Sequence, residues 1–194
     1  MPEIFTEQQV KMRQELLIGI ERAQQMPTVP LHSHEFIELA FIASGSALHF
    51  HNGRNGEIRF DGLIQGDLFS VQIGEQHSYK HCRNMVLYNL YLKPALLDRF
   101  RNLEDLPGWK LLFGERTGLS GKLIHLSPEE RAKMVQCLEQ ILNEYRLMPQ
   151  GYETMITALT TEFLVTVVRA AANWRSDFKD IYPGILESIS MMER

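Results

Sequence analysis

The sequence lacks the features that mark secreted and membrane-spanning chains. Its 194 residues contain two cysteines, Cys82 and Cys137, which lie far apart, and this argues against a disulfide-stabilised scaffold. No apolar run is long enough to span a bilayer, and the first residues lack the basic and then apolar order of a secretory signal. We therefore expect a cytoplasmic protein that has no membrane partner.

Basic residues are also too few and too scattered to form a nucleic-acid-binding face. The formal net charge is −4, and the 20 Lys and Arg residues do not form a cluster. A domain that grips DNA by itself usually presents a basic surface that displaces counterions from the phosphates. The sequence therefore predicts that any contact with DNA is made by a part of the protein outside these residues.

Short β-strands are predicted for the first half of the chain. Residues 31–93 contain five apolar or alternating stretches: FIELAFIA, SALHFHN, EIRFDGLI, DLFSVQI and MVLYNLYL. The turn signals near them are Ser44-Gly45, Asn52-Gly53, Asn55-Gly56, Gly66-Asp67 and Gly74. The stretch LLIGIER at 16–22 either extends the polar segment before it or opens a strand, and its alternation favours a strand. Many short strands at this spacing are typical of a barrel or sandwich such as a jelly roll.

Helical periodicity replaces this pattern after Pro94. Ser127 is the expected N-cap of a long helix, with Pro128 at its first position and Glu130 completing a capping box. A second helix, predicted over about 150–174, is apolar on most of its surface. Its apolar residues either pack on the preceding helix and the barrel or form a subunit interface. We expect a homodimer, with these interface residues: Leu159, Phe163 and Val167.

Histidines and a glutamate alternate in the stretch LHSHEFIELAFIASG, residues 31–45. Residues two and six apart in a strand point to the same face. We therefore expect His32, His34, Phe36 and Glu38 to face the barrel interior, with the intervening apolar residues on the opposite face. Further histidines follow in later strands: His49, His51 and His77. Imidazoles together with a carboxylate suit Fe, Mn, Ni or Zn.

The spacing of these residues resembles the two motifs of the cupin superfamily. The first motif is His32-x-His34-x3-Glu38-x6-Gly45, and the second is Gly66-x5-Gln72-x-Gly74-x2-His77. The resemblance implies that one divalent transition metal is held inside a jelly-roll barrel by four ligands: His32, His34, Glu38 and His77. Three positions depart from the motifs: Met26, Gln72 and His81.

A narrower resemblance covers residues 28–97 well and the later helices only in layout. The stretches HSHEFIELAFIASGSALHFHNG, QGDLFSVQIGEQHSY and NMVLYNLYLKPALL resemble the N-terminal effector domain of AraC/XylS-family transcription regulators, most closely the rhamnose-activator branch. The resemblance implies a mainly β fold with C-terminal helices, a cupin-like barrel followed by an antiparallel helical segment. Residues 1–93 would form the effector domain, of which 1–26 are an N-terminal extension, and 94–174 the helical dimerisation segment. Residues 175–194 would be a linker and the truncated start of a DNA-binding domain with two helix-turn-helix motifs.

The same resemblance implies a small-molecule effector, with a sugar favoured, inside the barrel. Three interpretations of the histidine and glutamate quartet stay open: a catalytic metal, a metal held without turnover, or a polar pocket without metal. The AraC-type context favours the third, so the sequence establishes no cofactor. The expected ligand-binding residues are His32, His34, Phe36, Glu38, His49, His77 and Tyr79.

The alternative function is a metal-dependent cupin enzyme, either a dioxygenase or a sugar isomerase. Such an enzyme needs an open position on the metal and a side chain placed for acid–base work. The barrel strands show no obvious second catalytic carboxylate, and this favours a protein that is not an enzyme.

Overall fold

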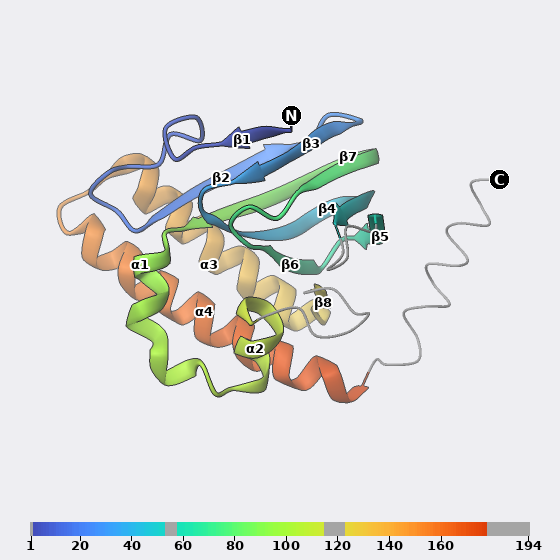
Figure 1. Cartoon of the computed structure of the whole chain (residues 1–194). Helices are drawn as coiled ribbons and strands as arrows, with labels where there is room; N and C mark the ends of the chain where they lie inside the picture. The colour runs from blue at the N-terminus through green and yellow to red at the C-terminus, as the bar shows by residue number, and fades with distance from the viewer. Residues whose placement is uncertain (1, 53–57, 115–122, 178–194) are drawn as a thin grey trace.

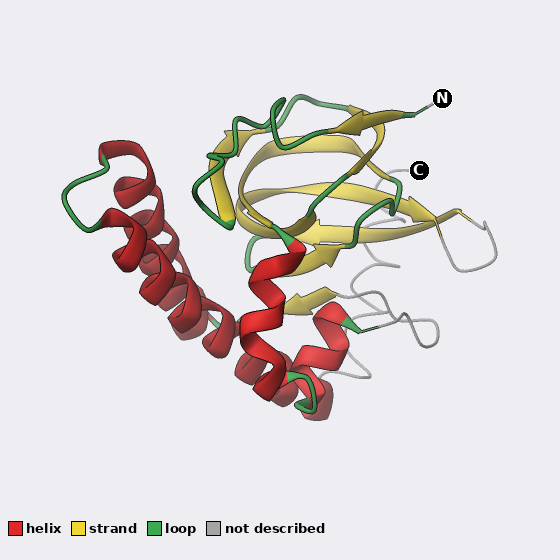
Figure 2. Ribbon diagram, turned by 60° about the vertical axis from the view of Figure 1, so that its left-hand side comes forward, coloured by secondary structure: helices red, strands yellow, loops and turns green. Residues whose placement is uncertain are grey.

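A curved β-sheet forms the first half of the chain, and helices cover one side of it (Figures 1 and 2). The structure is a computed structural model that describes residues 2–52, 58–114 and 123–177. The strands are β1 Glu3–Phe5, β2 Ile18–Gln24, β3 Val29–His34, β4 Ile37–Asn52, β5 Ile58–Ile64, β6 Asp67–Val71, β7 His77–Leu92 and β8 Leu123–His125. The helices are α1 Pro94–Leu97, the 3-10 helix Asp98–Leu103, α2 Pro107–Phe113, α3 Pro128–Leu147 and α4 Tyr152–Asp177.

Two 16-residue strands, β4 and β7, connect the sheet. They pair antiparallel with each other, β7 also pairs with β2 and β3, and β4 also pairs with β5 and β6. The main path through the sheet runs β1-β3-β7-β4-β6-β8. The predicted mainly β, cupin-like barrel with C-terminal helices is therefore confirmed, as is the strand predicted for LLIGIER.

Strand β4 is buried on both faces because each face belongs to a different core. Leu39 and Phe41 belong to the core between the sheet and the helices, whereas Ala40 and Ile42 belong to a second core inside the barrel. Alternation along a strand produces this division. It also directs Glu38, which shares the face of Ala40, into the barrel.

The turn predicted at Ser44-Gly45 is wrong, because β4 runs through both residues without ending. Gly45 lies instead at an irregularity in the pairing with β7, where its φ is +78°. A Cβ atom here would lie 2.3 Å from the carbonyl oxygen of Arg83. Only glycine combines this left-handed conformation with such a close approach. The signals at Asn52-Gly53 and Asn55-Gly56 involve residues 53–57, which lie outside the described residues.

The histidine-rich stretch is also divided differently from the prediction. β3 ends at His34 and β4 begins at Ile37, so the chain bends at Glu35 and Phe36 between them. The side chains of His34, Phe36 and Glu38 nevertheless line the same cavity. The prediction that they share an environment therefore survives, although they do not belong to one strand.

The predicted start of the long helix is confirmed at α3. The Ser127 side chain accepts a hydrogen bond from the backbone N–H of Glu130, and the Glu130 carboxylate accepts one from the N–H of Ser127. These bonds satisfy two N–H groups that the helix leaves without internal partners. Figure 1 shows α3 and α4 side by side beneath the sheet, joined by a short turn.

Two of the three residues expected at a dimer interface are buried inside this chain. Phe163 is 1% exposed and Val167 is fully buried, whereas Leu159 is partly buried against the same core. Helix α4 is covered by α3 on one side and by α2 on another. At Gly108 of α2 a Cβ would clash with the carbonyl oxygen of Val168. Phe163 and Val167 therefore lie in the core and are not available to a partner.

Helix α4 is also long and apolar enough to cross a membrane, over Tyr152–Asn173, by length and composition alone. The expectation that no apolar run has this length is therefore wrong. The core helix of a soluble protein passes the same test, and the apolar residues of α4 include Phe163, Leu164 and Val168 of the core. Packing against α2 and α3 thus accounts for its apolar character.

Candidate functional site

A cavity of about 420 Å³ opens into the barrel between the N-terminal segment and strands β2, β3, β4 and β7. Five of the predicted ligand-binding residues line it: His32, His34, Phe36, Glu38 and Tyr79. The other two, His49 and His77, are buried directly behind this lining. The structure therefore brings all seven predicted residues to one region of the barrel.

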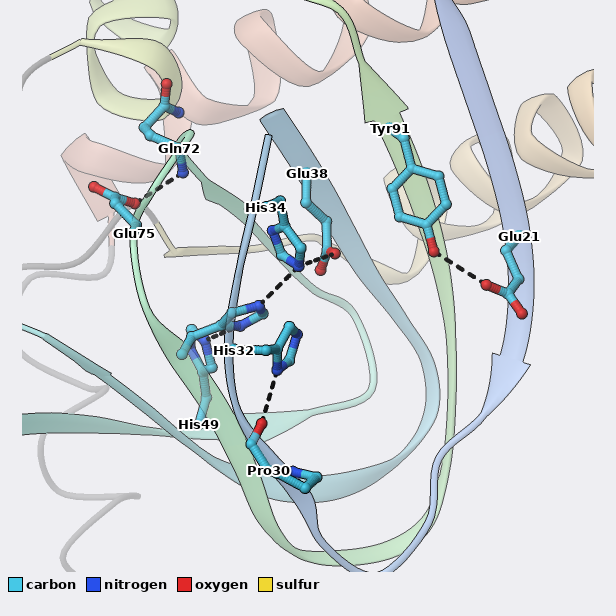
Figure 3. Close-up of polar contacts among 10 residues, drawn as sticks. Glu21, Pro30, His32, His34, Glu38, His49, Gln72, Glu75 and Tyr91 are labelled. Carbon is cyan, nitrogen blue, oxygen red and sulfur yellow. Dashed lines mark hydrogen bonds and ion pairs between the residues drawn. The ribbon is translucent and has the colours of Figure 1, made fainter. Parts of the chain in front are cut away.

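Three imidazoles form the centre of this region. The nitrogen atoms that His32, His34 and His77 offer all lie within 4.8 Å of one another. The Nε2 atoms of His34 and His77 are 3.3 Å apart. The Nε2 of His34 also lies 3.4 Å from Oε2 of Glu38 (Figure 3). Strand β3 supplies two of the histidines, and β7 pairs with it so that His77 stands opposite His32.

Hydrogen bonds around the cluster fix one of these rings. Nδ1 of His32 lies 2.8 Å from the carbonyl oxygen of Pro30, and because a carbonyl can only accept, this nitrogen carries the hydrogen. The Nε2 of His32 therefore keeps a free lone pair. Behind the cluster, Nδ1 of His77 lies 3.1 Å from Nε2 of His49, so one of these two rings donates to the other.

Burial favours the neutral form of each group in the cluster. It lowers the pKa of His34 to about 3, with a smaller contribution from His32, and it lowers the pKa of His77 well below the ordinary value. Burial likewise raises the pKa of Glu38 to about 8, with a smaller contribution from the negative charge of Glu21. At neutral pH, and without a cation beside it, Glu38 is therefore mainly protonated.

Four buried polar atoms at the cavity have no hydrogen-bond partner among the described residues: His34 Nδ1, Glu38 Oε1, Tyr79 OH and Asn89 Oδ1. The residues that carry them all line the cavity. A buried polar group without a partner costs about 1–3 kcal/mol, and such groups are rare in folded proteins. The concentration of unpaired polar atoms in one cavity indicates a binding site for a polar ligand.

The cavity residues that the sequence prediction missed include Glu21, Asn89 and Tyr91. The hydroxyl of Tyr91 donates to Oε2 of Glu21 over 3.0 Å (Figure 3). Glu21 places a second carboxylate at the cavity, whereas the sequence showed no obvious second catalytic carboxylate in the barrel strands. The only available signal was the spacing of Asn89 and Tyr91, two residues apart, which places them on one face of a strand.

The N-terminal segment forms one wall of the cavity. Phe5, Gln9 and Val10 line it, and the Phe5 ring lies 4.7 Å from the ring of His32. Strand β1 pairs in parallel with β3, so that Phe5 stands beside His34. The predicted N-terminal extension, residues 1–26, therefore contributes directly to the site.

The donor set fits a divalent transition metal. Neighbouring ligand atoms around a small cation lie about 3 Å apart, because each is about 2.0–2.2 Å from the ion, and the separations of 3.3 and 3.4 Å at His34 Nε2 are close to this value. His32 shows the arrangement common among metal-binding histidines, in which the other ring nitrogen donates to a backbone carbonyl. The three histidines could therefore hold such an ion, and the Glu38 carboxyl group lies beside one of them, His34.

The curved barrel, its polar cavity and the helices beneath it define the class as a cupin-type ligand-binding domain. The family model described as "AraC-like ligand binding domain" matches residues 16–151. The chain belongs to this family.

Curated relatives carry the name "HTH-type transcriptional activator RhaR". The one from Cronobacter sakazakii is 29% identical over 141 residues, which cover 62% of this chain and 48% of the relative. The one from Escherichia coli O1:K1 is 26% identical over 172 residues, which cover 76% of this chain and 57% of the relative. The matched part of this chain spans about half the length of these two relatives.

Solved structures of oxalate decarboxylases are similar over part of the chain. The enzyme from Lactobacillus farciminis, in a formate complex, matches with 22% identity and a TM-score of 0.36, covering 40% of this chain and 24% of that one. The Bacillus subtilis enzyme at pH 4.6 matches with 19% identity and a TM-score of 0.37, and the match covers 47% of this chain and 24% of that enzyme. Scores this low carry no argument about the function of this chain.

The burial of Glu38 predicts how stability depends on pH. Its folded pKa of about 8 lies above the unfolded value of 4.5, so the folded state binds the proton more tightly. In chelator-treated protein this group lowers the free energy of unfolding by about 1 kcal/mol per pH unit between those values. We expect Glu38→Gln to gain stability relative to the parent protein as pH rises from 5 to 8, measured by urea unfolding. A constant difference across this range would contradict the assignment.

Proposed function

We propose that the barrel binds a small-molecule effector and that a sugar is the favoured class. Unpaired hydrogen-bonding atoms on a wall of aromatic rings carry this proposal: Tyr79 and Asn89 offer polar atoms beside the rings of Phe36 and Tyr91. Sugars present hydroxyl groups that both donate and accept, together with apolar faces that stack on rings. The sequence resemblance to the rhamnose-activator branch points to the same class.

The effector domain would act inside a longer transcription regulator of the AraC type. We propose that DNA is bound by a C-terminal helix-turn-helix domain, as the names of the relatives suggest. The linker and the start of that domain, predicted for 175–194, fall almost wholly on residues 178–194, which lie outside the described residues. We also propose a homodimer, in which the exposed Met155 and the partly buried Leu159 of α4 contribute to the interface.

The N-terminal segment offers a route from the cavity to the helices. It lines the cavity with Phe5 and Val10, and a few residues later it is bonded to α3. The backbone N–H of Arg13 donates to the hydroxyl of Tyr145, and this hydroxyl donates to the carbonyl oxygen of Lys11. A ligand changes a conformational equilibrium only when it binds two arrangements with different affinity. Contacts with this segment would supply that difference.

A metal held by His32, His34, His77 and Glu38 is a second, compatible proposal. The cluster of three buried imidazole nitrogens supports it. A bound divalent cation would supply a Lewis-acidic centre that can also coordinate a ligand hydroxyl. The protein residues would fix the ion and exclude water from the interior, and the positive charge of the ion would favour the ionised form of Glu38. We propose that the site binds without turnover, because the family to which the chain belongs is one of ligand-binding domains.

Binding of L-rhamnose tests the effector proposal. A ligand at 100 times its dissociation constant stabilises the folded state by about 2.7 kcal/mol, so the thermal midpoint should rise. Tyr79→Phe removes an unpaired buried hydroxyl and should leave the ligand-free stability unchanged or slightly higher, while weakening sugar binding about three- to tenfold. Tyr152→Phe, outside the cavity, serves as the control. If neither L-rhamnose nor any other sugar of a monosaccharide panel binds, the sugar proposal is wrong.

Equilibrium dialysis tests the metal proposal. Protein stripped with a chelator and exposed to Zn²⁺, Ni²⁺ or Mn²⁺ should bind one ion per chain. His77→Ala should weaken this binding by more than about tenfold, since it removes a ligand. His81→Asn, at an exposed position, is the matched control. Binding of the metal that is equal in the two variants would show that the ion occupies some other place.

A further inference from the structure

Three hydrogen-bond acceptors lie together beside the histidine cluster. They come from three neighbouring strands: Glu21 from β2, Glu38 from β4 and Asn89 from β7. Glu21 stands opposite Asn89 in the pairing of β2 with β7, and Glu38 stands opposite Tyr91 in the pairing of β4 with β7. All four side chains line the same cavity. We refer to Glu21, Glu38 and Asn89 as the acceptor cluster.

Two members of the acceptor cluster each keep one oxygen without a donor among the described residues. Oε1 of Glu38 and Oδ1 of Asn89 are buried and have no hydrogen-bond partner among the described residues. The neighbouring hydroxyl of Tyr91 does not supply the missing donor to Asn89. Its one hydrogen is donated to Oε2 of Glu21 over 3.0 Å. The Asn89 oxygen therefore keeps its unused capacity to accept a hydrogen bond.

Charge around the acceptor cluster is entirely of one sign. The described residues that line the cavity include Glu21 and Glu38 but neither lysine nor arginine. A buried carboxylate is costly unless a cation or several donors accompany it. Among its described lining residues the cavity therefore offers neither lysine nor arginine to pair with a carboxylate or a phosphate on a ligand, or to neutralise Glu38 in its ionised form.

We infer that the acceptor cluster is a binding subsite for a primary ammonium group on the effector. An ammonium group has three N–H donors, and the cluster offers three acceptor side chains. The rings of Phe36 and Tyr91, whose centroids are 4.8 Å apart, add aromatic surface of the kind that attracts cations. This inference rests on the proposed effector-binding function and narrows its ligand to an amine-bearing, hydroxylated molecule such as an amino sugar.

The ammonium subsite is separate from the proposed metal site, although both use Glu38. The metal would take Oε2, the oxygen that lies 3.4 Å from His34, whereas the ammonium group would take the unpaired Oε1. Asn89 and Glu21 belong to the ammonium subsite alone. Experiments on chelator-treated protein therefore address the ammonium group without interference from a metal.

Three matched probes test the inference: trans-2-aminocyclohexanol, trans-1,2-cyclohexanediol and trans-2-hydroxycyclohexanecarboxylate. They share a ring and one hydroxyl and differ in a single group, which is cationic, neutral or anionic. Binding to the chelator-treated domain is measured at pH 7 by NMR titration. Because a charge-assisted hydrogen bond is about twice as strong as a neutral one, the amine should bind about tenfold more tightly than the diol. The carboxylate should bind most weakly of the three.

Two variants test whether Glu38 is responsible for the preference for the amine over the diol. Glu38→Gln should remove most of the tenfold advantage of the amine, since glutamine keeps the shape of the side chain but cannot form a carboxylate beside the ammonium group. Glu104→Gln, which removes an exposed carboxylate far along the chain, should retain the full preference.

Any other result of the probe and variant experiments would overturn the inference of an ammonium subsite. An amine that binds no better than the diol, a carboxylate that binds as well as the amine, or no binding of the amine at all would each do so. So would a preference for the amine that Glu38→Gln leaves intact, because the charge would then be recognised elsewhere. The effector proposal is judged separately. If a neutral sugar binds and Tyr79→Phe weakens its binding, that proposal stands even when the probes show no preference for the amine.

Discussion

Strand β4 places a carboxyl group inside the barrel and large apolar side chains on its other face, and the structure depends on this division. Glu38 is 3% exposed, and its neighbours Ile37 and Leu39 pack into the core shared with the helices. Burying a carboxyl group is unfavourable, whereas burying two large aliphatic side chains contributes about 1.5–3 kcal/mol each. The apolar face thus holds the strand in a register that keeps an unsatisfied polar group in the interior.

Helices α3 and α4 are connected to the site although none of their described residues lines the cavity. They cover the outer face of the sheet. Tyr145 of α3 is hydrogen-bonded to Lys11 and Arg13, and Tyr152 of α4 is hydrogen-bonded to Glu15, a few residues after the part of the N-terminal segment that lines the cavity. Lys93, just after β7, pairs with Glu7 of that segment over 3.0 Å. The wall of the cavity is thereby connected to both layers of the domain. A ligand that moves this wall would act on the helices without touching them.

Local signals predicted the parts of the fold that local interactions determine. The capping box at Ser127 and Glu130 was predicted because its partners are three residues apart. The shared environment of His34, Phe36 and Glu38 was predicted because strand alternation is a local rule. Gly45 was misassigned, since a glycine with positive φ serves a turn or an irregularity in a strand equally well. Only the pairing of β4 with β7 decides between the two.

Residues whose role depends on distant partners were missed or misplaced. Asn89 reads as an ordinary strand residue until its register with Glu21 is known. Phe163 and Val167 show the apolar spacing expected of an interface, and helical periodicity does not tell whether the covering surface belongs to the same chain. Strand β8, with three residues, was not predicted at all. It pairs with β6, so that His125 stands opposite Asp67, and a pairing between residues so far apart in the sequence has no local signature.

The most direct test is a crystal structure of the domain with the sugar or amine-bearing ligand that stabilises it most. The unpaired buried atoms predict that the ligand lies inside the barrel, within hydrogen-bond distance of the Tyr79 hydroxyl and the Asn89 oxygen. The ring of the ligand should lie against Phe36 or Tyr91. A ligand found outside the barrel, for example in the cavity lined by Leu16, Leu96 and Ile156, with Tyr79 and Asn89 still unpaired, would contradict the central claim.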